Sequence, residues 1–272
     1  MAGIPAPTGS GDSAEDAFDT SLPDYAARNR AHWDAASARY QAEQGHQLRD
    51  SGGLGWGVWQ IPEVDLRILG DVAGRTTLEL GCGAAQWSIG LARAGALAIG
   101  VDLSEEQLKA AWVAAREAGV TIRLLHASAE AVPLPDASAD IVFSDWGAFR
   151  FADPDLVVPE AARLLRPGGL LAFSTATPLL DLCWAGDAVS PGDRLLRDYF
   201  DLGRLDFATT TEFQRTTGDW IRLFRRHELA VEDLVELRPP DGATTTYWEP
   251  EAYDWARRWP AEQIWRVRRE GA

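Results

Sequence analysis

The sequence predicts an α/β fold, with a doubly wound, mostly parallel seven-stranded sheet and helices on both faces. Short apolar runs alternate with helical patterns between residues 76 and 175. The first run ends at a glycine pair, Gly81 and Gly83, and the second ends at Asp102. Such alternation is typical of right-handed βαβ units, whose ligands gather at the carboxyl ends of the strands.

Each element follows from a local pattern. The expected parallel strands are 76–80, 96–101, 121–125, 139–144 and 170–175, with helices at 86–94, 104–118 and 155–165. Ser104 precedes an acid-rich first turn, which is typical of a helix N-cap. The Pro-Gly-Gly triplet at 167–169 is expected to stop the helix before the fifth strand. A helix at 218–228 and strands at 231–237 and 261–268 complete the prediction.

The flanking segments are less regular. Residues 25–44 predict one or two amphipathic helices, and 63–69 a short one. Four glycines within 51–57 predict a flexible loop instead of regular structure. Between 178 and 217 the alternation stops, and we expect short helical stretches around 193–200 and a threonine-rich piece at 208–217.

The composition disfavours several function classes. The chain has 272 residues, and 26 basic against 41 acidic side chains give a net charge of −15. Such a charge repels nucleic acid backbones and anionic membranes. Two cysteines, the lack of a signal peptide pattern and the lack of an apolar run of ~20 residues favour a cytoplasmic protein. Twelve tryptophans suit a pocket for a flat or apolar small molecule.

The acids around the glycine turn indicate which ligand it binds. Asp102, 19 residues after Gly83, is placed to accept hydrogen bonds from ribose hydroxyls, as in NAD sites. Glu79, however, would repel the pyrophosphate of a dinucleotide. Gln86 stands where the dinucleotide fingerprint has its third glycine. A ligand with an adenosine and an ammonium group but no phosphate fits better, and S-adenosylmethionine is such a ligand.

Residues 77–102 resemble motif I and the following acid of class I, Rossmann-fold, S-adenosylmethionine-dependent methyltransferases, in particular their small-molecule "methyltransferase type 11" branch. Other segments resemble that family in order: the N-terminal helix at 31–40, the adenine-binding loop at 126–136, motif IV at 140–145 and the segment before strand 5 at 160–170. The resemblance covers roughly residues 25 to 175 and implies S-adenosylmethionine as the cofactor, with no metal.

The resemblance also implies roles for single residues. Gly81 and Gly83 would contact the methionine part, Glu79 its amino group, Asp102 the ribose and Leu103 the adenine. The further cofactor contacts would be Trp33, Tyr40, Gln86, Gln107, Ser128, Ala129, Glu130, Asp145 and Trp146. Trp33 and Tyr40 fit core packing equally well, and Asp145 could instead bind a neighbouring backbone amide. Two positions depart from the family: Ala85 replaces a common glycine, and Ser128 replaces a common aspartate, which predicts weaker cofactor binding.

The resemblance implies methyl transfer to an O, N or C atom of a small organic molecule. The protein would mainly align the reactants, and it needs a base only if the acceptor must lose a proton. Asp145 and His46, which flanks the glycine loop, are the candidate catalytic residues. One alternative is a methyltransferase-fold protein that binds the cofactor but catalyses another reaction, such as a cyclisation; a non-catalytic module and a nicotinamide dehydrogenase are further alternatives.

The expected organisation is a disordered acidic tail at 1–20 followed by one domain at 21–272. Within that domain we expect an N-terminal helical lid at 21–70, a cofactor-binding core at 71–177, an inserted substrate lid at 178–217, and a C-terminal helix with the last strands at 218–272. The partner is a small-molecule methyl acceptor, not nucleic acid or a membrane. The sequence leaves the oligomeric state open.

Overall fold

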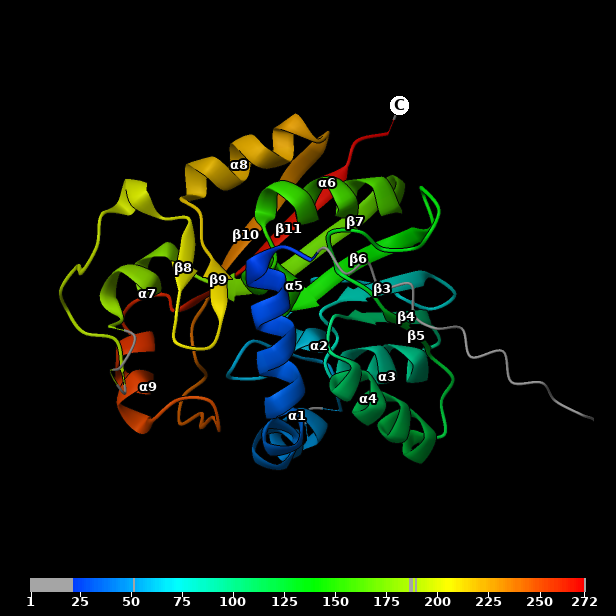
Figure 1. Ribbon diagram of the computed structural model, residues 1–272, viewed down its shortest axis with the longest axis horizontal. Helices are drawn as coiled ribbons and strands as arrows, with labels where there is room; N and C mark the ends of the chain where they lie inside the picture. The colour runs from blue at the N-terminus through cyan, green and yellow to red at the C-terminus, as the bar shows by residue number, and fades with distance from the viewer. Residues whose placement is uncertain (1–21, 51, 186–187, 189, 272) are drawn as a thin grey trace, which may run out of the picture.

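A seven-stranded sheet forms the centre of the protein (Figure 1). The computed structural model describes residues 22–50, 52–185, 188 and 190–271, so the expected tail at 1–20 lies outside the described residues. The strand order is β10-β11-β7-β6-β3-β4-β5. The strands are β3 (Thr76–Leu80), β4 (Leu97–Asp102), β5 (Arg123–His126), β6 (Ala139–Asp145), β7 (Leu165–Ala176), β10 (Leu229–Leu237) and β11 (Glu262–Arg269). β11 runs in the opposite direction to the other six strands of this sheet, and the mostly parallel arrangement confirms the predicted fold class.

Helices cover both faces of this sheet (Figure 1). The α-helices are α1 (Asp24–Asp50), α2 (Glu63–Leu66), α3 (Gln86–Arg93), α4 (Glu105–Ala118), α5 (Ala148–Phe151), α6 (Pro154–Leu164), α7 (Pro178–Cys183), α8 (Thr217–Arg226) and α9 (Pro250–Ala256). Successive residues of β6 point to opposite faces. Val142 joins the core under α6 and α8, whereas Ile141 and Phe143 join the core on the α3 side. Both faces are therefore apolar, as a doubly wound sheet requires.

The start of α4 was predicted from its cap. The Ser104 hydroxyl accepts a hydrogen bond from the Gln107 backbone N–H, and Glu105 and Glu106 lie in the first turn. Gly119 ends the helix with a left-handed backbone at φ 67°. The two ends of α4 are therefore determined by the residues at its caps, Ser104 and Gly119.

The Pro-Gly-Gly triplet does not separate α6 from the next strand. Helix α6 ends at Leu164, and β7 begins at once with Leu165, so the triplet lies inside β7. The pairing with β6 is irregular there: Ala139 faces Leu165, but Ile141 faces Leu170. A β-bulge accommodates the extra residues, and regular pairing resumes where the sequence predicted the strand.

The N-terminal prediction needs two corrections. A single helix, α1, runs through Gly45 and His46, where we expected it to have ended. The glycine-rich segment is not wholly irregular, because β1 (Gly55–Trp56) pairs with β2 (Ile61–Pro62). The Trp56 side chain is fully buried, and its Nε1 donates to Glu63 Oε2 at 2.6 Å, which explains the order in this segment.

The segment after β7 also differs from expectation. The stretch around 193–200 has no α-helix, and only a 3-10 turn, η1 (Tyr199–Asp201), lies there. The threonine-rich piece contributes β9 (Thr211–Phe213), which pairs with β8 (Arg204–Asp206). Helices α5, α7 and α9, of four to seven residues each, were not predicted.

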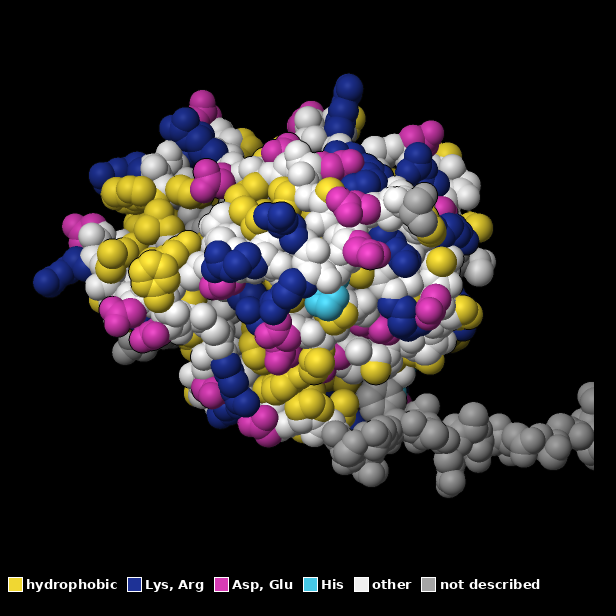
Figure 2. Space-filling model, turned by 90° about the horizontal axis from the view of Figure 1, so that it is seen from above, with side chains coloured by type: hydrophobic (Ala, Val, Ile, Leu, Met, Phe, Trp, Pro, Cys, Tyr) yellow, Lys and Arg dark blue, Asp and Glu magenta, His cyan; other side chains and the backbone are white. Residues whose placement is uncertain are grey.

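The surface seen from above carries interspersed acidic and basic side chains, with hydrophobic side chains gathered at the left edge (Figure 2). The segment that follows α7 lies on that side and exposes Leu195, Leu196, Tyr199 and Phe200. Among the described helices, none combines the length and apolar character needed to cross a bilayer.

Candidate functional site

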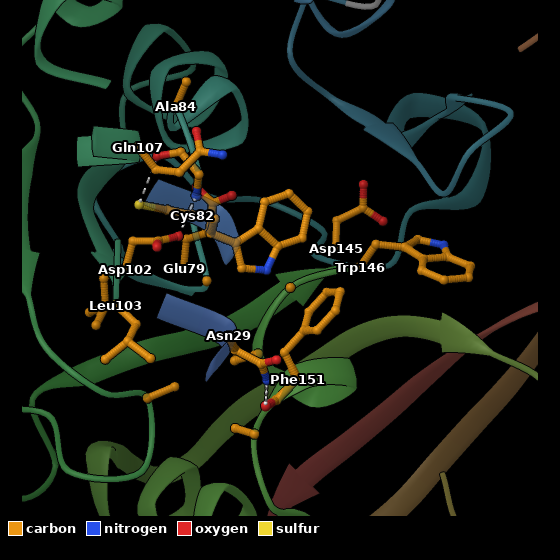
Figure 3. Close-up of a pocket in the computed structure, with 18 of the residues that line it drawn as sticks. Asn29, Glu79, Cys82, Ala84, Asp102, Leu103, Gln107, Asp145, Trp146 and Phe151 are labelled. Carbon is orange, nitrogen blue, oxygen red and sulfur yellow. Dashed lines mark hydrogen bonds between the residues drawn. The ribbon is translucent and has the colours of Figure 1, made fainter. Parts of the chain in front are cut away.

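A cavity of about 300 Å³ lies over the carboxyl ends of β3, β4 and β6 (Figure 3). Helix α1 and the segment around Tyr247 complete its wall. The sequence predicted fourteen lining residues as cofactor contacts: Trp33, Tyr40, Glu79, Gly81, Gly83, Gln86, Asp102, Leu103, Gln107, Ser128, Ala129, Glu130, Asp145 and Trp146. His46 is absent from the lining; it lies on α1 with an exposed side chain, so the structure does not bring it to the cavity.

The glycine turn after β3 is shaped by close backbone contacts. A Cβ on Gly81, whose φ is +73°, would lie 2.6 Å from the Ala148 amide nitrogen. A Cβ on Gly147 would likewise lie 2.6 Å from the Gly81 carbonyl oxygen. Neither position can take a side chain without moving backbone, so β3 and the residues after β6 meet directly under the cavity.

Asp102 ends β4 and holds the turn in place. Its Oδ2 accepts from the Gly83 amide at 2.7 Å, and its Oδ1 accepts from the Ser104 amide at 2.8 Å. Burial raises the pKa of this carboxyl. Asp102 and Leu103 lie together on one side of the cavity, and Asp145 and Trp146 on the other (Figure 3).

Glu79 is a buried carboxyl group beside the glycine turn. Its side chain is 4% exposed, and its Oε2 accepts from the Ser88 amide at 3.0 Å and the Ser88 hydroxyl at 2.6 Å. Burial raises the pKa of Glu79 to about 8. No lysine or arginine of the described chain forms an ion pair with it. A buried carboxylate without a cation is costly, and a cationic ligand would offset that cost.

Asp145, at the end of β6, is held by neutral donors. Its Oδ1 accepts from the Gly57 amide at 2.9 Å and from the Ser174 hydroxyl, and its Oδ2 accepts from Trp87 Nε1 at 3.2 Å. The alternative left open by the sequence, a bond to a backbone amide, is therefore present, although Gly57 is far away in the chain. Burial raises the pKa of Asp145 to about 6.

Trp146 has an unusual backbone and a fixed ring. Its φ of 48° is left-handed, and its Nε1 donates to Glu262 Oε1 at 2.5 Å. Left-handed non-glycine residues are uncommon and cluster at functional sites. The strain at Trp146 is consistent with a role for this ring in the cavity.

Sequence reasoning missed several lining residues. Tyr247 contacts Tyr40 through their hydroxyls at 2.8 Å, and Trp248 follows it in the wall. Asn29 donates to the carbonyl oxygens of Phe151 at 2.9 Å and Thr211 at 2.8 Å, which fixes α1 over the cavity (Figure 3). The paired aromatics at 247–248 were the available signal, but nothing local indicates that they reach the cofactor motif.

The charged groups that line the cavity are all acidic. Its lining within the described residues contains four carboxyl groups, those of Glu79, Asp102, Glu130 and Asp145, and no lysine, arginine or histidine. Elsewhere a buried acid does have a basic partner, since Arg150 Nη2 lies 2.7 Å from Asp181 Oδ1. Among the described residues, no group of three or more potential ligands is arranged for a metal ion.

Fold and site together define an α/β protein with a nucleoside-type site at the ends of parallel strands. Residues 78–173 match the methyltransferase domain family. The ubiquinone biosynthesis O-methyltransferase of Ralstonia nicotianae is 37% identical over 190 residues, which cover 62% of this chain and 79% of that protein. The chain belongs to the S-adenosylmethionine-dependent methyltransferases of class I.

Other relatives match over shorter stretches. The corresponding enzyme of Methylococcus capsulatus is 40% identical over 107 residues, and the match spans 38% of this chain and 44% of that protein's length. A crystal structure of an S-adenosylmethionine-dependent methyltransferase from Mesorhizobium loti superposes with a TM-score of 0.62 at 26% identity, and covers 75% of this chain and 95% of that one.

Proposed function

We propose that this protein transfers the methyl group of S-adenosylmethionine to an O, N or C atom of a small organic molecule. The observation that carries the proposal is the cavity at the glycine turn, whose charged lining is acidic only. Such a lining favours a ligand with a positive charge and disfavours phosphates. A dinucleotide or a nucleic acid backbone is therefore a poor fit, and a sulfonium compound a good one.

The chain's own residues fit this cofactor. A Cβ on Gly83 would meet only Gln107 Oε1, at 3.9 Å, so the turn leaves its backbone open to a ligand at this position. Glu79 would hold the amino group, because its buried carboxyl lacks a cationic partner in the described chain. Asp102 would accept from the ribose hydroxyls, and Leu103 with Ala129 would bound the adenine. When bound, S-adenosylmethionine supplies a methyl group attached to positively charged sulfur.

Asp145 is proposed as a positioning residue. Its oxygens already accept from Gly57, Ser174 and Trp87, so it joins the N-terminal segment and α3 to the end of β6. With these donors in place it would fix the cavity wall and would not need to remove a proton. His46 lies outside the cavity and has no role in this proposal.

We propose that contacts made by α1 exclude water from the cavity. Tyr40 on α1 meets Tyr247, and Gln47 Oε1 accepts from the Thr246 amide at 2.7 Å. We propose that α1 and residues 245–248 cover the bound ligands. The described residues of 178–217 do not line the cavity, so a lid role for that segment would require movement.

The proposed setting is the cytoplasm, with a small molecule as the partner. Both cysteines, Cys82 and Cys183, are free and buried, which suits a reducing compartment. Two relatives are named as ubiquinone biosynthesis O-methyltransferases, which agrees with a small-molecule acceptor.

Methyl-labelled S-adenosylmethionine incubated with the protein and a metabolite extract tests the proposal. We expect a labelled metabolite and an equal amount of S-adenosylhomocysteine, both reduced in the Asp102→Asn variant. A new product without S-adenosylhomocysteine would instead support the cyclase-type alternative. Failure to bind S-adenosylmethionine at all would overturn the proposal.

A further inference from the structure

The cavity extends past Asp145, away from the glycine turn and Asp102, into a part where the sequence predicted only Tyr40 and Trp146 as cofactor contacts (Figure 3). Tyr40, Val58, Trp146, Tyr247 and Trp248 line it, and we call it the acceptor compartment. Asp145 and Trp146 lie opposite Asp102 and Leu103 (Figure 3). The compartment is therefore the space beyond the proposed cofactor, where a methyl acceptor would bind.

Aromatic rings dominate this compartment. The ring centroid of Trp248 lies 6.1 Å from that of Trp146, 5.5 Å from Trp184 and 5.8 Å from Trp59. Tyrosine and tryptophan faces carry partial negative charge and attract cations, most strongly where water is excluded. A wall of this kind favours an ammonium group over a neutral group of the same shape.

Asp145 lines the cavity and Glu262 lies behind Trp146, and the hydrogen bonds to both carboxyl groups come from neutral donors. Glu262 is 1% exposed; its Oε1 accepts from the Val58 amide at 2.8 Å and from Trp146 Nε1, whereas its Oε2 has no hydrogen-bond partner. Asp145 likewise bonds only to neutral donors. Burial raises the pKa of Glu262 to about 8, because burial disfavours the charged carboxylate. A nearby cation would stabilise that carboxylate.

The protein pairs a comparable buried acid with arginine elsewhere. Arg150 is 4% exposed and donates two hydrogen bonds of 2.7 Å to Asp181. No described lysine or arginine does this for Asp145 or Glu262. Among the described residues no side chain supplies a positive charge at the acceptor compartment, so a ligand would have to supply it.

We propose that the acceptor compartment selects amines, so that the methyl group goes to nitrogen. This inference rests on the proposed methyl transfer. A bound ammonium group first loses a proton to solvent, which frees the nitrogen lone pair. That lone pair forms the new N–C bond while the C–S bond breaks, and the electron pair of the broken bond stays on sulfur. The positive charge thus moves from sulfur to nitrogen within the compartment, and a secondary amine then releases a proton to solvent.

An oxygen acceptor suits the same surroundings poorly. A phenolate would bring a negative charge beside Asp145, where like charges repel, and beside Glu262, whose raised pKa shows that its surroundings already disfavour negative charge. A neutral phenol would have to lose its proton and become that disfavoured anion, whereas an ammonium group that loses a proton becomes a neutral amine. After transfer to oxygen, no positive charge would remain near the two carboxyl groups.

The test is a binding measurement on the full chain saturated with S-adenosylhomocysteine, which represents the state after transfer. Calorimetry compares choline with 3,3-dimethylbutan-1-ol, its neutral carbon isostere. We expect choline to bind at least about tenfold more tightly. The ratio should fall towards one in Trp248→Leu and in Glu262→Gln, and stay unchanged in Glu251→Gln, which removes an exposed charge from α9.

Each outcome is decisive. Equal affinity for the two probes in the unmodified protein, with S-adenosylhomocysteine bound, would overturn this inference alone. A choline preference that survives both Trp248→Leu and Glu262→Gln, with folding verified by circular dichroism, would also overturn it. No binding of S-adenosylhomocysteine would overturn the proposed function, and this inference with it.

Discussion

Replacement of Glu79 by glutamine should stabilise the cofactor-free protein and weaken its affinity for S-adenosylmethionine. The carboxyl group is buried and accepts from Ser88, and burial raises its pKa from 4.5 to about 8. A carboxyl whose pKa is raised on folding holds its proton more tightly in the native state. Its contribution to stability is therefore complete below pH 4.5 and is lost as the pH rises to 8.

The size of both effects follows from these values. At pH 7, roughly 2.5 units above the ordinary pKa, the loss is about 3 kcal/mol, since one unit corresponds to about 1.4 kcal/mol. Glutamine keeps the shape and an acceptor for Ser88 but carries no charge. The free energy of unfolding of the variant at pH 7 should therefore be higher by up to about 3 kcal/mol. For a chain of this size the gain is roughly 6–12 °C in Tm. Loss of a charged partner for the cofactor should cost about 10- to 100-fold in affinity.

Differential scanning calorimetry between pH 5 and pH 8, and titration calorimetry with S-adenosylmethionine, measure the two effects. The Tm of the unmodified protein should fall more steeply with pH than that of Glu79→Gln. Glu117→Gln, an exposed site on α4, serves as the charge-matched control and should change neither quantity. An equal or lower Tm for Glu79→Gln, together with unchanged affinity, would refute the reasoning.

Three further predictions concern other parts of the fold. Asp102→Asn should weaken S-adenosylmethionine binding about 10- to 100-fold, because an amide replaces a charged acceptor; unchanged calorimetric affinity would contradict this. Arg150→Met should cost about 3–5 kcal/mol in urea unfolding, since Asp181 and Glu212 lose their cation, and a smaller loss than about 1 kcal/mol would disprove it. Ala85→Gly should change stability by less than about 1 kcal/mol, because relief of a left-handed φ of 58° offsets the lost buried methyl group; a larger Tm shift than a few degrees would rule this out.

The predictable part of the fold depends on local signals. Strand β3 has the predicted limits, because its buried run is bounded by polar residues and a glycine turn. The predicted cofactor residues on β3, β4 and β6 share one cavity because these strands are parallel neighbours, and their carboxyl ends meet at one edge. Glu79, Asp102 and Asp145 each follow from that rule.

The parts that were missed depend on distant partners. Gly55 and Trp56 form β1 because Glu63 and the buried core hold the tryptophan, which a count of glycines does not reveal. Tyr247 reaches Tyr40 from 207 residues away, and no periodicity encodes that contact. Asp145 is similarly tied to Gly57, so its role in the cavity wall could not be inferred from motif IV alone.

Titration of the full chain with S-adenosylmethionine, and separately with ATP, tests the central claim most directly. Both ligands carry adenosine, but only S-adenosylmethionine brings positive charge to the acidic lining formed by Glu79, Asp102 and Asp145. We predict saturable one-to-one binding of S-adenosylmethionine and no detectable binding of ATP. Binding of ATP with equal or higher affinity, or no binding of S-adenosylmethionine, would contradict the account.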